Sequence, residues 1–235
     1  WKNLSIKNQN LNLSELKREH LPKHFSFSQL AAYKTCPLQY KFAFILKVPA
    51  PDKPSLIFGR VMHDVFCDFL KPLVNSFQAS LFNSSEINPD ILSFKRLEKI
   101  LSNFWQEDGY ENAEQRENYK KKAKQAIRIF YETFCQNSIP KIVFLEKNFS
   151  FKIGGATLKG KIDRVDKLED GVEIIDYKTG NPKKQTDLSF DDKSQLIIYQ
   201  LFLEEILQTK VLSLKYYYVE DGSFVSFLPK ESEKE

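Results

Sequence analysis

Two short stretches in the second half of the chain decide the expected fold: residues 160–166 read GKIDRVD, and residues 174–180 read IIDYKTG. From Pro140 onward the spacing of apolar residues falls from near four to two, which is the period of a β-strand. Asp170-Gly171, between the two stretches, is a tight-turn signal. We therefore expect two neighbouring antiparallel strands here.

The polar residues of these strands are of the types that bind a divalent cation and assist hydrolysis. Asp176 and Lys178 are two apart, so they project from one face of their strand. Asp163 ends the partner strand and is expected to reach the same place. Paired carboxylates are hard oxygen ligands for Mg²⁺ or Mn²⁺, and a neighbouring ammonium can orient an attacking water or neutralise growing negative charge. The alternative is a salt bridge at a strand end, which by itself contributes only about 0–1 kcal/mol when exposed.

The rest of the chain predicts a helical first half followed by a sheet. Ser26 with Gln29 fits a capping box, and Pro37 ends the helix that it opens. Residues 75–90 are rich in Ser and Asn and predict weak structure. The apolar spacing predicts further helices over residues 38–46, 58–77, 91–104, 114–135 and 194–207, and strands over 149–153, around 158–165, and over 172–177, 211–219 and 223–228.

This order predicts one α/β domain with a mixed central sheet flanked by helices and a helical N-terminal elaboration. We expect residues 1–24 to be an arm or linker, and residues 25–235 to be the domain, with a helical insertion at about 78–138. Because the chain starts with Trp1, we expect it to be a fragment of a longer polypeptide.

Composition excludes several classes of protein. Of the 235 residues, 42% are hydrophobic and 28% charged, including 20 Phe and 10 Tyr, which is typical of a folded domain and not of a disordered chain. No uninterrupted apolar stretch is long enough to span a bilayer, so we expect no membrane partner. Three widely spaced cysteines and no signal peptide predict a reducing, cytoplasmic location. The net charge of +4 is too small to identify a partner.

At this point the sequence resembles a known family. Four motifs, in this order, resemble those of RecB-like nucleases of the PD-(D/E)XK superfamily: GRVMH at 59–63, GxIDRVD at 160–166, DYKTG at 176–180, and Gln195-x-x-x-Tyr199. Residues 27–42, FSxLxxYxxCPxxYxF, are similar to the motif that opens this domain where it is fused to UvrD-type helicases or found in AddAB enzymes.

The resemblance implies a PD-(D/E)XK fold and a role for each matching residue. His63, Asp163 and Asp176 would ligate Mg²⁺ or Mn²⁺, with the backbone carbonyl of Tyr177 as a further ligand. Lys178 would be the catalytic lysine. Gln195 and Tyr199 would position the active site or the DNA backbone. Glu146 would be a supporting acidic residue.

In some RecB-like nucleases, one early and three late cysteines hold an iron–sulfur cluster, and the cysteines of this chain do not follow that pattern. Cys36 matches the early position, but no cysteine follows Cys135. We therefore expect no iron–sulfur cluster in this chain, and expect Cys36 to pack as a small apolar residue.

Other residues allow two interpretations. His63 could be a core histidine, and the motif order favours the ligand. The run Tyr216-Tyr217-Tyr218 could stack nucleobases, but such a run is more often a buried strand. Basic residues could contact DNA phosphates or simply face solvent, and these are Arg116, Lys120, Lys124 and Arg128 on one helix stripe, and Lys183 and Lys184 in a loop.

The function expected from these observations is a metal-dependent DNA nuclease acting on single-stranded DNA or unwound duplex, in DNA repair or recombination, beside a helicase in the same or a partner chain. No GxxxxGK[ST] phosphate loop occurs, so this chain is not expected to hydrolyse ATP. The alternative is a catalytically silent nuclease-fold module for DNA binding or protein docking. A third interpretation, a stand-alone exonuclease like those of CRISPR adaptation, fits less well with the missing late cysteines and the start at Trp1.

Overall fold

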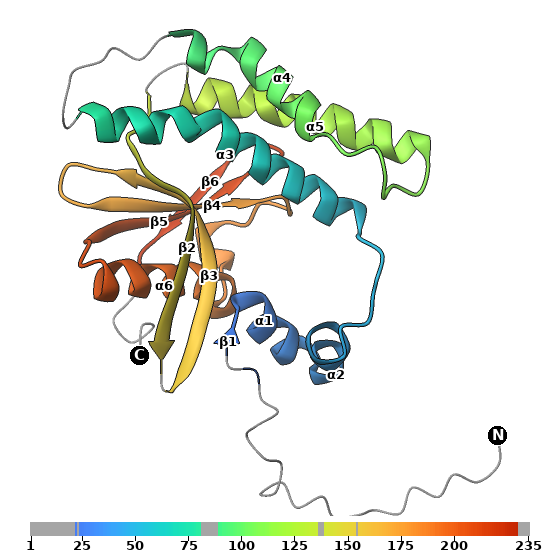
Figure 1. The fold of residues 1–235 in the computed structure, drawn as a ribbon, viewed down its shortest axis with the longest axis vertical. Coiled ribbons are helices and arrows are strands. Elements are labelled where there is room, and N and C mark those ends of the chain that lie inside the picture. Colours follow the sequence, from blue (N-terminus) through green and yellow to red (C-terminus); the bar gives the residue numbers. More distant parts are fainter. Residues whose placement is uncertain (1–21, 23, 81–88, 136–138, 154, 230–235) are drawn as a thin grey trace, which may run out of the picture.

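The computed structural model describes residues 22, 24–80, 89–135, 139–153 and 155–229. Its first half is helical and its second half is mainly sheet (Figure 1). The helical elements of the first half are α1 (Phe27–Thr35), α2 (Pro37–Tyr40), the π-helix η3 (Lys41–Ile45), α3 (Pro54–Ser80), the 3₁₀ turn η4 (Pro89–Leu92), α4 (Phe94–Phe104) and α5 (Ala113–Phe134).

The sheet is mixed, with both parallel and antiparallel pairs. Its strand order is β1-β3-β4-β5-β6, with β2 paired to the other edge of β3. β1 runs parallel to β3 and β4 parallel to β5, whereas the β2–β3, β3–β4 and β5–β6 pairs are antiparallel. The strands are β1 (His24–Phe25), β2 (Ile142–Ile153), β3 (Ala156–Lys167), β4 (Val172–Lys178), β5 (Val211–Tyr218) and β6 (Phe224–Phe227).

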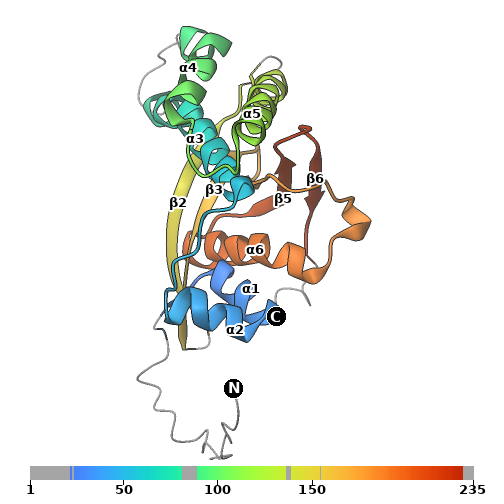
Figure 2. The same ribbon diagram turned by 90° about the vertical axis from the view of Figure 1, so that its right-hand side faces the viewer.

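Helices cover both faces of this sheet, which gives three layers (Figures 1 and 2). On one face, α3, α4 and α5 enclose a core in which the rings of Phe66 and Phe130 stack 3.8 Å apart. On the other face lie α6 (Phe190–Leu201) and the π-helix η6 (Phe202–Ile206), preceded by the 3₁₀ turn η5 (Gln185–Asp187). Alternation along β4 sends Ile175 and Tyr177 into the first core, and Ile174 into the second. The predicted α/β fold class is confirmed.

One edge of β3 is left open in its middle. β2 follows β3 along nearly its whole length, so β1 and β4 must share the opposite edge. On that edge β1 pairs at Thr157 and Leu158, and β4 pairs only from Arg164 to Lys167. The stretch 159–163 lies between these two partners. The sheet is therefore parted at the motif that carries Asp163.

Capping explains several helix starts. Ser26 and Gln29 form the predicted capping box: the Ser26 side chain accepts from Gln29 N, and Gln29 Oε1 accepts from Ser26 N. Ser189 and Asp192 form a second box, so α6 begins at Phe190 and not at Ser194 as predicted.

Three other expectations need correction. The predicted weak structure of residues 75–90 is wrong for 75–80, because α3 continues to Ser80 with Pro72 inside it. The strand expected from Phe149 begins at Ile142. His24, expected in the arm, lies in β1. The rest of the arm apart from Pro22, and Gly154 of the Gly154-Gly155 turn signal, fall outside the described residues.

The tyrosine run of β5 is core, as favoured: Tyr216, Tyr217 and Tyr218 are all buried. The predicted domain bounds and the helical insertion at 78–138 stay predictions. Among the helices of the described residues, none is both long enough and apolar enough to cross a bilayer.

Gly160 offers a test of how tightly β2 and β3 pack. It lies opposite Phe149, and a Cβ at position 160 would come within 2.5 Å of Phe149 Cζ. Because Phe149 is buried and cannot swing away freely, Gly160→Ala is expected to lower the free energy of unfolding by about 1–3 kcal/mol, measured by urea denaturation.

The matched control is Gly180→Ala, because a Cβ there meets nothing within 4 Å and its effect should be close to zero. Adding Phe149→Leu to Gly160→Ala should restore part of the loss. Equal stabilities for the two alanine variants would contradict the packing.

Candidate active site

The site is built where β3 and β4 separate. Pairing of the two strands stops at Arg164 and Ile175, so the backbone N–H of Tyr177 has no strand partner from β3. It donates instead to Asp163 Oδ2 over 2.9 Å. A side-chain carboxylate thus replaces a carbonyl of the ladder, and its position is fixed by the backbone of β4.

His63 reaches this carboxylate from α3. Its Nδ1 lies 3.4 Å from Asp163 Oδ2, and its Nε2 lies 3.1 Å from the backbone carbonyl oxygen of Tyr177. The His63 side chain is 29% exposed, so it borders the site and is not sealed in the core. Three of the groups implied as metal ligands, which come from α3, β3 and β4, therefore meet at one point.

Glu146 of β2 belongs to the same point. One ligand atom each from His63, Glu146 and Asp163 all lie within 4.8 Å of one another. Glu146 has a φ of +49°, a left-handed conformation that is unfavourable for a residue with a side chain. The carboxylate is thus held among other acids by a strained backbone, with Lys161 as its ion-pair partner. The sequence expectation gave Glu146 only a supporting role, and the geometry groups it with His63 and Asp163.

A second group of residues surrounds Asp176 on the α6 side. Lys178 Nζ lies 2.7 Å from Asp176 Oδ2 and donates to Gln195 Oε1 over 2.8 Å. Gln195 Nε2 donates in turn to Asp176 Oδ1 at 3.0 Å and to the hydroxyl of Tyr199 at 2.6 Å. The four predicted residues form one hydrogen-bonded network, which fixes the lysine beside the acid.

Burial and neighbouring charges shift the pKa values of the acids and of the imidazole. Burial raises the pKa of Asp176 to about 6, although Lys178 opposes the shift. Burial also raises the pKa of Glu146, against the effect of Lys161. Burial alone would lower the pKa of His63, but the Asp163 carboxylate outweighs it and raises that pKa to about 9. Several buried carboxylates in one place favour a positive partner.

The donor set fits a divalent cation. Asp176 Oδ2 is buried and accepts no hydrogen bond with good geometry, although Lys178 is close. Carboxylate and carbonyl oxygens suit Mg²⁺ and Mn²⁺, and an added imidazole is better tolerated by Mn²⁺. His63, Asp163, Asp176 and the Tyr177 carbonyl together offer such a set.

A cavity of about 310 Å³ adjoins these residues. Its walls include His63, Asp163 and Tyr199 of the site, and Ser26 and Phe27 at the start of α1. Lys159 and Lys161 also line it, so the cavity offers positive charge next to the candidate ligands.

Asp166, in the same motif as Asp163, has a different task. Its carboxylate binds the fully buried Arg164 through two contacts, at 2.7 Å and 2.5 Å. The guanidinium also lies 4.2 Å from the centre of the Phe134 ring. This pair is therefore part of the core beneath the site.

The predicted DNA-binding residues are not gathered at the site. Arg116 and Lys120 form ion pairs with Glu107, and Arg128 lies over the ring of Phe94. Lys183 pairs with Asp192 at 2.5 Å. Lys124 and Lys184 are exposed. A DNA-binding role for this set stays a prediction.

Two residues at the site were not expected. Lys161 pairs with Glu146, and Tyr216 lies under Lys178, whose Nζ is 4.9 Å from the ring centre. Lys161 could have been suspected, because it is two residues before Asp163 in the GKIDRVD motif. Tyr216 carries no such signal, since its run predicts core and it is indeed buried.

The Arg164–Asp166 pair gives a test that separates structural from catalytic acids. Asp166→Ala leaves a buried guanidinium uncompensated, so we expect the free energy of unfolding to fall by about 3 kcal/mol in urea denaturation. Replacing both partners by apolar residues, Arg164→Met with Asp166→Leu, should recover most of that loss. A loss well below about 1 kcal/mol for Asp166→Ala would contradict this role.

Comparisons with known proteins agree with this fold. The family model described as the PD-(D/E)XK nuclease superfamily matches residues 24–235. Among solved structures, the chain is similar to a crystal structure of a proposed exonuclease from Eubacterium rectale, with a TM-score of 0.51 and 13% identity over 100% of this chain and 80% of that one. No curated protein matches the chain. The chain belongs to the PD-(D/E)XK nuclease superfamily.

Proposed function

We propose that this chain is a deoxyribonuclease domain that hydrolyses phosphodiester bonds with Mg²⁺ or Mn²⁺. The observation that carries the proposal is the meeting of His63, Asp163 and Tyr177 at one point, with Asp176 and Lys178 on the adjoining strand. Family membership supports it, because the fold is that of a nuclease superfamily.

The cation would be held by His63, Asp163, Asp176 and the Tyr177 carbonyl, with Glu146 as an additional acid. When bound, such an ion polarises a phosphoryl oxygen and makes a coordinated water more acidic.

The protein's own groups orient the reaction. The Lys178 ammonium, held by Gln195, is placed to position the attacking water and to neutralise charge that grows on the phosphate. Gln195 fixes both Lys178 and Asp176, and Tyr199 fixes Gln195. The Gln195–Tyr199 pair therefore acts by positioning, while Lys178 touches the reacting atoms.

The biological setting is a finer part of the proposal. The resemblance of residues 27–42 to the opening motif of helicase-associated domains supports a cytoplasmic role in DNA repair or recombination. The substrate would be single-stranded DNA or unwound duplex, supplied by a helicase in the same or a partner chain.

A silent module that binds DNA or protein is the second candidate. It is favoured only if binding to DNA is independent of divalent cations, because the acids would then have no ion to hold. The grouping of His63, Glu146 and Asp163 within the described residues, with Asp176 beside Lys178, favours the enzyme.

The first test removes the charge of Asp176 or of Lys178 while nearly keeping the size of the side chain. Asp176→Asn and Lys178→Met are each expected to slow digestion of a labelled single-stranded oligonucleotide in Mn²⁺ by at least about 100-fold. The first removes a charged ligand of the cation, and the second removes the positive charge that stabilises the transition state.

Lys167→Met is the matched control. Lys167 is on β3 like Asp163, but it lies at the end that is paired with Val172 of β4. Full activity of Asp176→Asn or Lys178→Met, with unchanged circular dichroism, would refute the assignment.

The second test measures the ion directly. Mn²⁺ at about 100 times its dissociation constant should stabilise the protein by about 2.7 kcal/mol, which for a chain of this size is a rise in Tm of roughly 2–4 °C per kcal/mol. Asp163→Asn keeps an oxygen that can accept from Tyr177 N but loses the charge. It should abolish the rise in a thermal-shift titration, and an undiminished rise would place the ion elsewhere.

A further inference from the structure

Glu146 and Asp163 lie directly opposite each other on neighbouring strands. β2 and β3 are antiparallel and Lys147 pairs with Ile162, so the next pair along the ladder is Glu146 with Asp163. Their carboxylates, together with the His63 imidazole, offer ligand atoms that all lie within 4.8 Å of one another. Like charges directly opposite each other on paired strands are destabilising. Two acids in this arrangement therefore need a positive group beside them.

Each of the three acids of the site has a positively charged neighbour. The pairs are Asp163 with His63, Asp176 with Lys178, and Glu146 with Lys161. In the proposed function, His63 is a candidate ligand and Lys178 touches the reacting atoms. Lys161 has neither role, so its pairing with Glu146 calls for a separate explanation.

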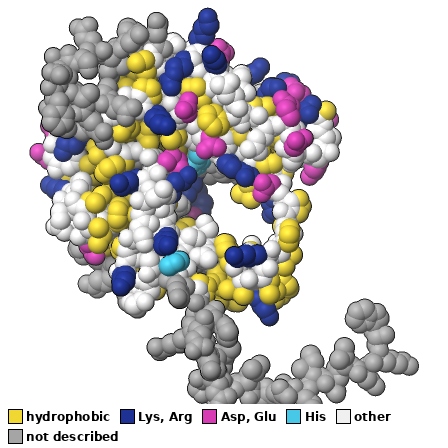
Figure 3. All heavy atoms as spheres, in the orientation of Figure 1, with side chains coloured by type: hydrophobic (Ala, Val, Ile, Leu, Met, Phe, Trp, Pro, Cys, Tyr) yellow, Lys and Arg dark blue, Asp and Glu magenta, His cyan; other side chains and the backbone are white. Residues whose placement is uncertain are grey.

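Lys161 reaches Glu146 from the open edge of the sheet. It is two residues before Asp163 on β3 and therefore projects from the same face, in the stretch 159–163 that β1 and β4 both leave unpaired. Its side chain is 52% exposed, whereas that of Glu146 is 17% exposed. Lys161 also lines the cavity beside the candidate ligands. In Figure 3, Lys or Arg side chains lie next to Asp or Glu side chains around an exposed histidine near the middle of this face.

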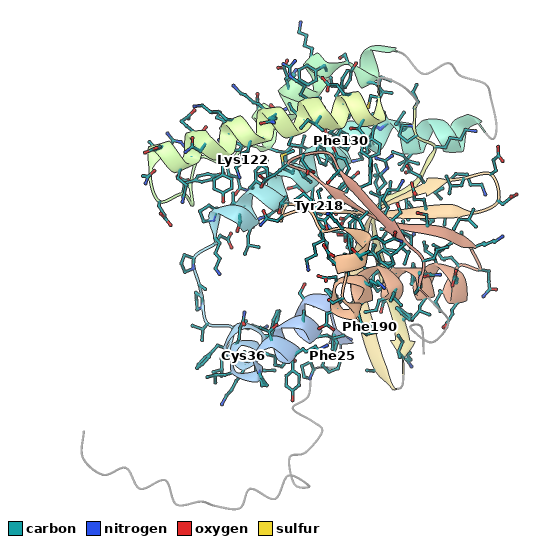
Figure 4. All side chains as sticks on the ribbon, turned by 180° about the vertical axis from the view of Figure 1, so that it is seen from behind. Phe25, Cys36, Lys122, Phe130, Phe190 and Tyr218 are labelled. Atoms are coloured by element: carbon teal, nitrogen blue, oxygen red, sulfur yellow. The ribbon has the colours of Figure 1, made fainter. Side chains whose placement is uncertain are left out.

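Glu146, by contrast, is held in place. Its backbone has a φ of +49°, and its neighbour Leu145 packs against the core that contains Phe130. Figure 4 shows how densely side chains surround Phe130 between α5 and the sheet. A strained backbone persists only where the surrounding structure fixes it. The carboxylate therefore stays next to the candidate ligands, and the exposed lysine is the partner that can adapt.

We propose that Lys161 substitutes for a cation at Glu146 and so keeps this acid from ligating the divalent ion. This inference rests on the proposed function and assigns Lys161 a positioning role in the same site. Mg²⁺ requires octahedral coordination, so every additional protein ligand removes a position that a water or a phosphoryl oxygen needs. By pairing with Glu146, Lys161 leaves the ion to the ligands from α3, β3 and β4 and keeps such positions open.

The first experiment measures Mn²⁺ binding to the full chain by isothermal titration calorimetry, without DNA. Lys161→Met removes the partner of Glu146, and the freed acid is expected to tighten Mn²⁺ binding by about 10-fold. The double variant with Glu146→Gln has the same net charge as the wild type, so its dissociation constant should stay within about 3-fold of the wild-type value. Unchanged binding by Lys161→Met overturns the proposal. A double variant that binds more than about 3-fold more weakly also overturns it, because Glu146 is then already a ligand.

Two further variants separate the ion pair from a general effect of charge. Lys159→Met removes a lysine that lies on the same face of β3, is exposed and lines the same cavity. Its dissociation constant for Mn²⁺ should change by less than about 3-fold, and Lys161→Arg, which keeps the charge, should bind Mn²⁺ like the wild type. Equal tightening by Lys159→Met and Lys161→Met overturns the proposal.

The second experiment measures the rate of cleavage of a single-stranded oligonucleotide at saturating Mn²⁺. Lys161→Met should bind the ion more tightly and yet cut about 10-fold more slowly, because the freed acid takes a position that water or phosphate needs. Adding Glu146→Gln should restore most of the rate. A double variant that is as slow as Lys161→Met shows that the lysine acts on the substrate itself and overturns the proposal.

The third experiment depends on neither metal nor cleavage. In urea denaturation with EDTA, Lys161→Met should lower the midpoint, because Glu146 then faces Asp163 without its partner, and adding Glu146→Gln should raise the midpoint again. If the wild type neither binds Mn²⁺ nor cuts DNA, it is the proposed function that fails, and this measurement still decides whether Lys161 neutralises Glu146. An unchanged midpoint for Lys161→Met overturns the pairing and the proposal with it.

Discussion

The hydrogen bond from Tyr177 N to the Asp163 carboxylate is the constraint on which the site depends. A sheet can part only if the freed backbone groups find other partners, because an unpaired buried amide is costly. Asp163 supplies that partner at the point where β3 and β4 separate. The same carboxylate meets His63, so the gap in the sheet and the candidate metal site have a single cause.

Other contacts of β3 hold the sheet together where β3 and β4 separate. β3 remains bonded to β2 over nearly its whole outer edge, and the buried Arg164–Asp166 pair lies just beyond the gap in the part still bonded to β4. Burial of several acids nearby costs stability, since it raises the pKa of Asp176 and of Glu146 above their usual values. Lys178 and Lys161 offset part of that cost. A divalent cation would offset more, which is why ion binding and stability are expected to rise together.

Local signals in the sequence predicted much of this structure, and contacts between distant segments account for the rest. Strand alternation placed Asp176 and Lys178 on one face, and the Ser26–Gln29 box placed the start of α1. The two-residue strand β1 could not be predicted, because it is too short for any periodicity and pairs with residues far along the chain. The strained φ of Glu146 is likewise set by its surroundings and not by its neighbours in sequence. The sequence predicted that Arg116 and Lys120 could contact phosphates, because it gave no sign that Glu107 lies beside both of them in the fold.

The open edge of β3 also explains why the start of the loosely packed segment 26–53 lies next to the candidate ligands. Residues 159–163 have no strand partner on that edge, and the first turn of α1 lies across the cavity there. The start of α1 therefore lines this cavity, although α1, α2 and η3 contain no buried residue. Segments with few buried contacts open at low free-energy cost, whereas the sheet behind them does not. The two parts of the site therefore differ in packing: the sheet and α3 fix the candidate ligands, and the loosely packed start of α1 lines the cavity beside them.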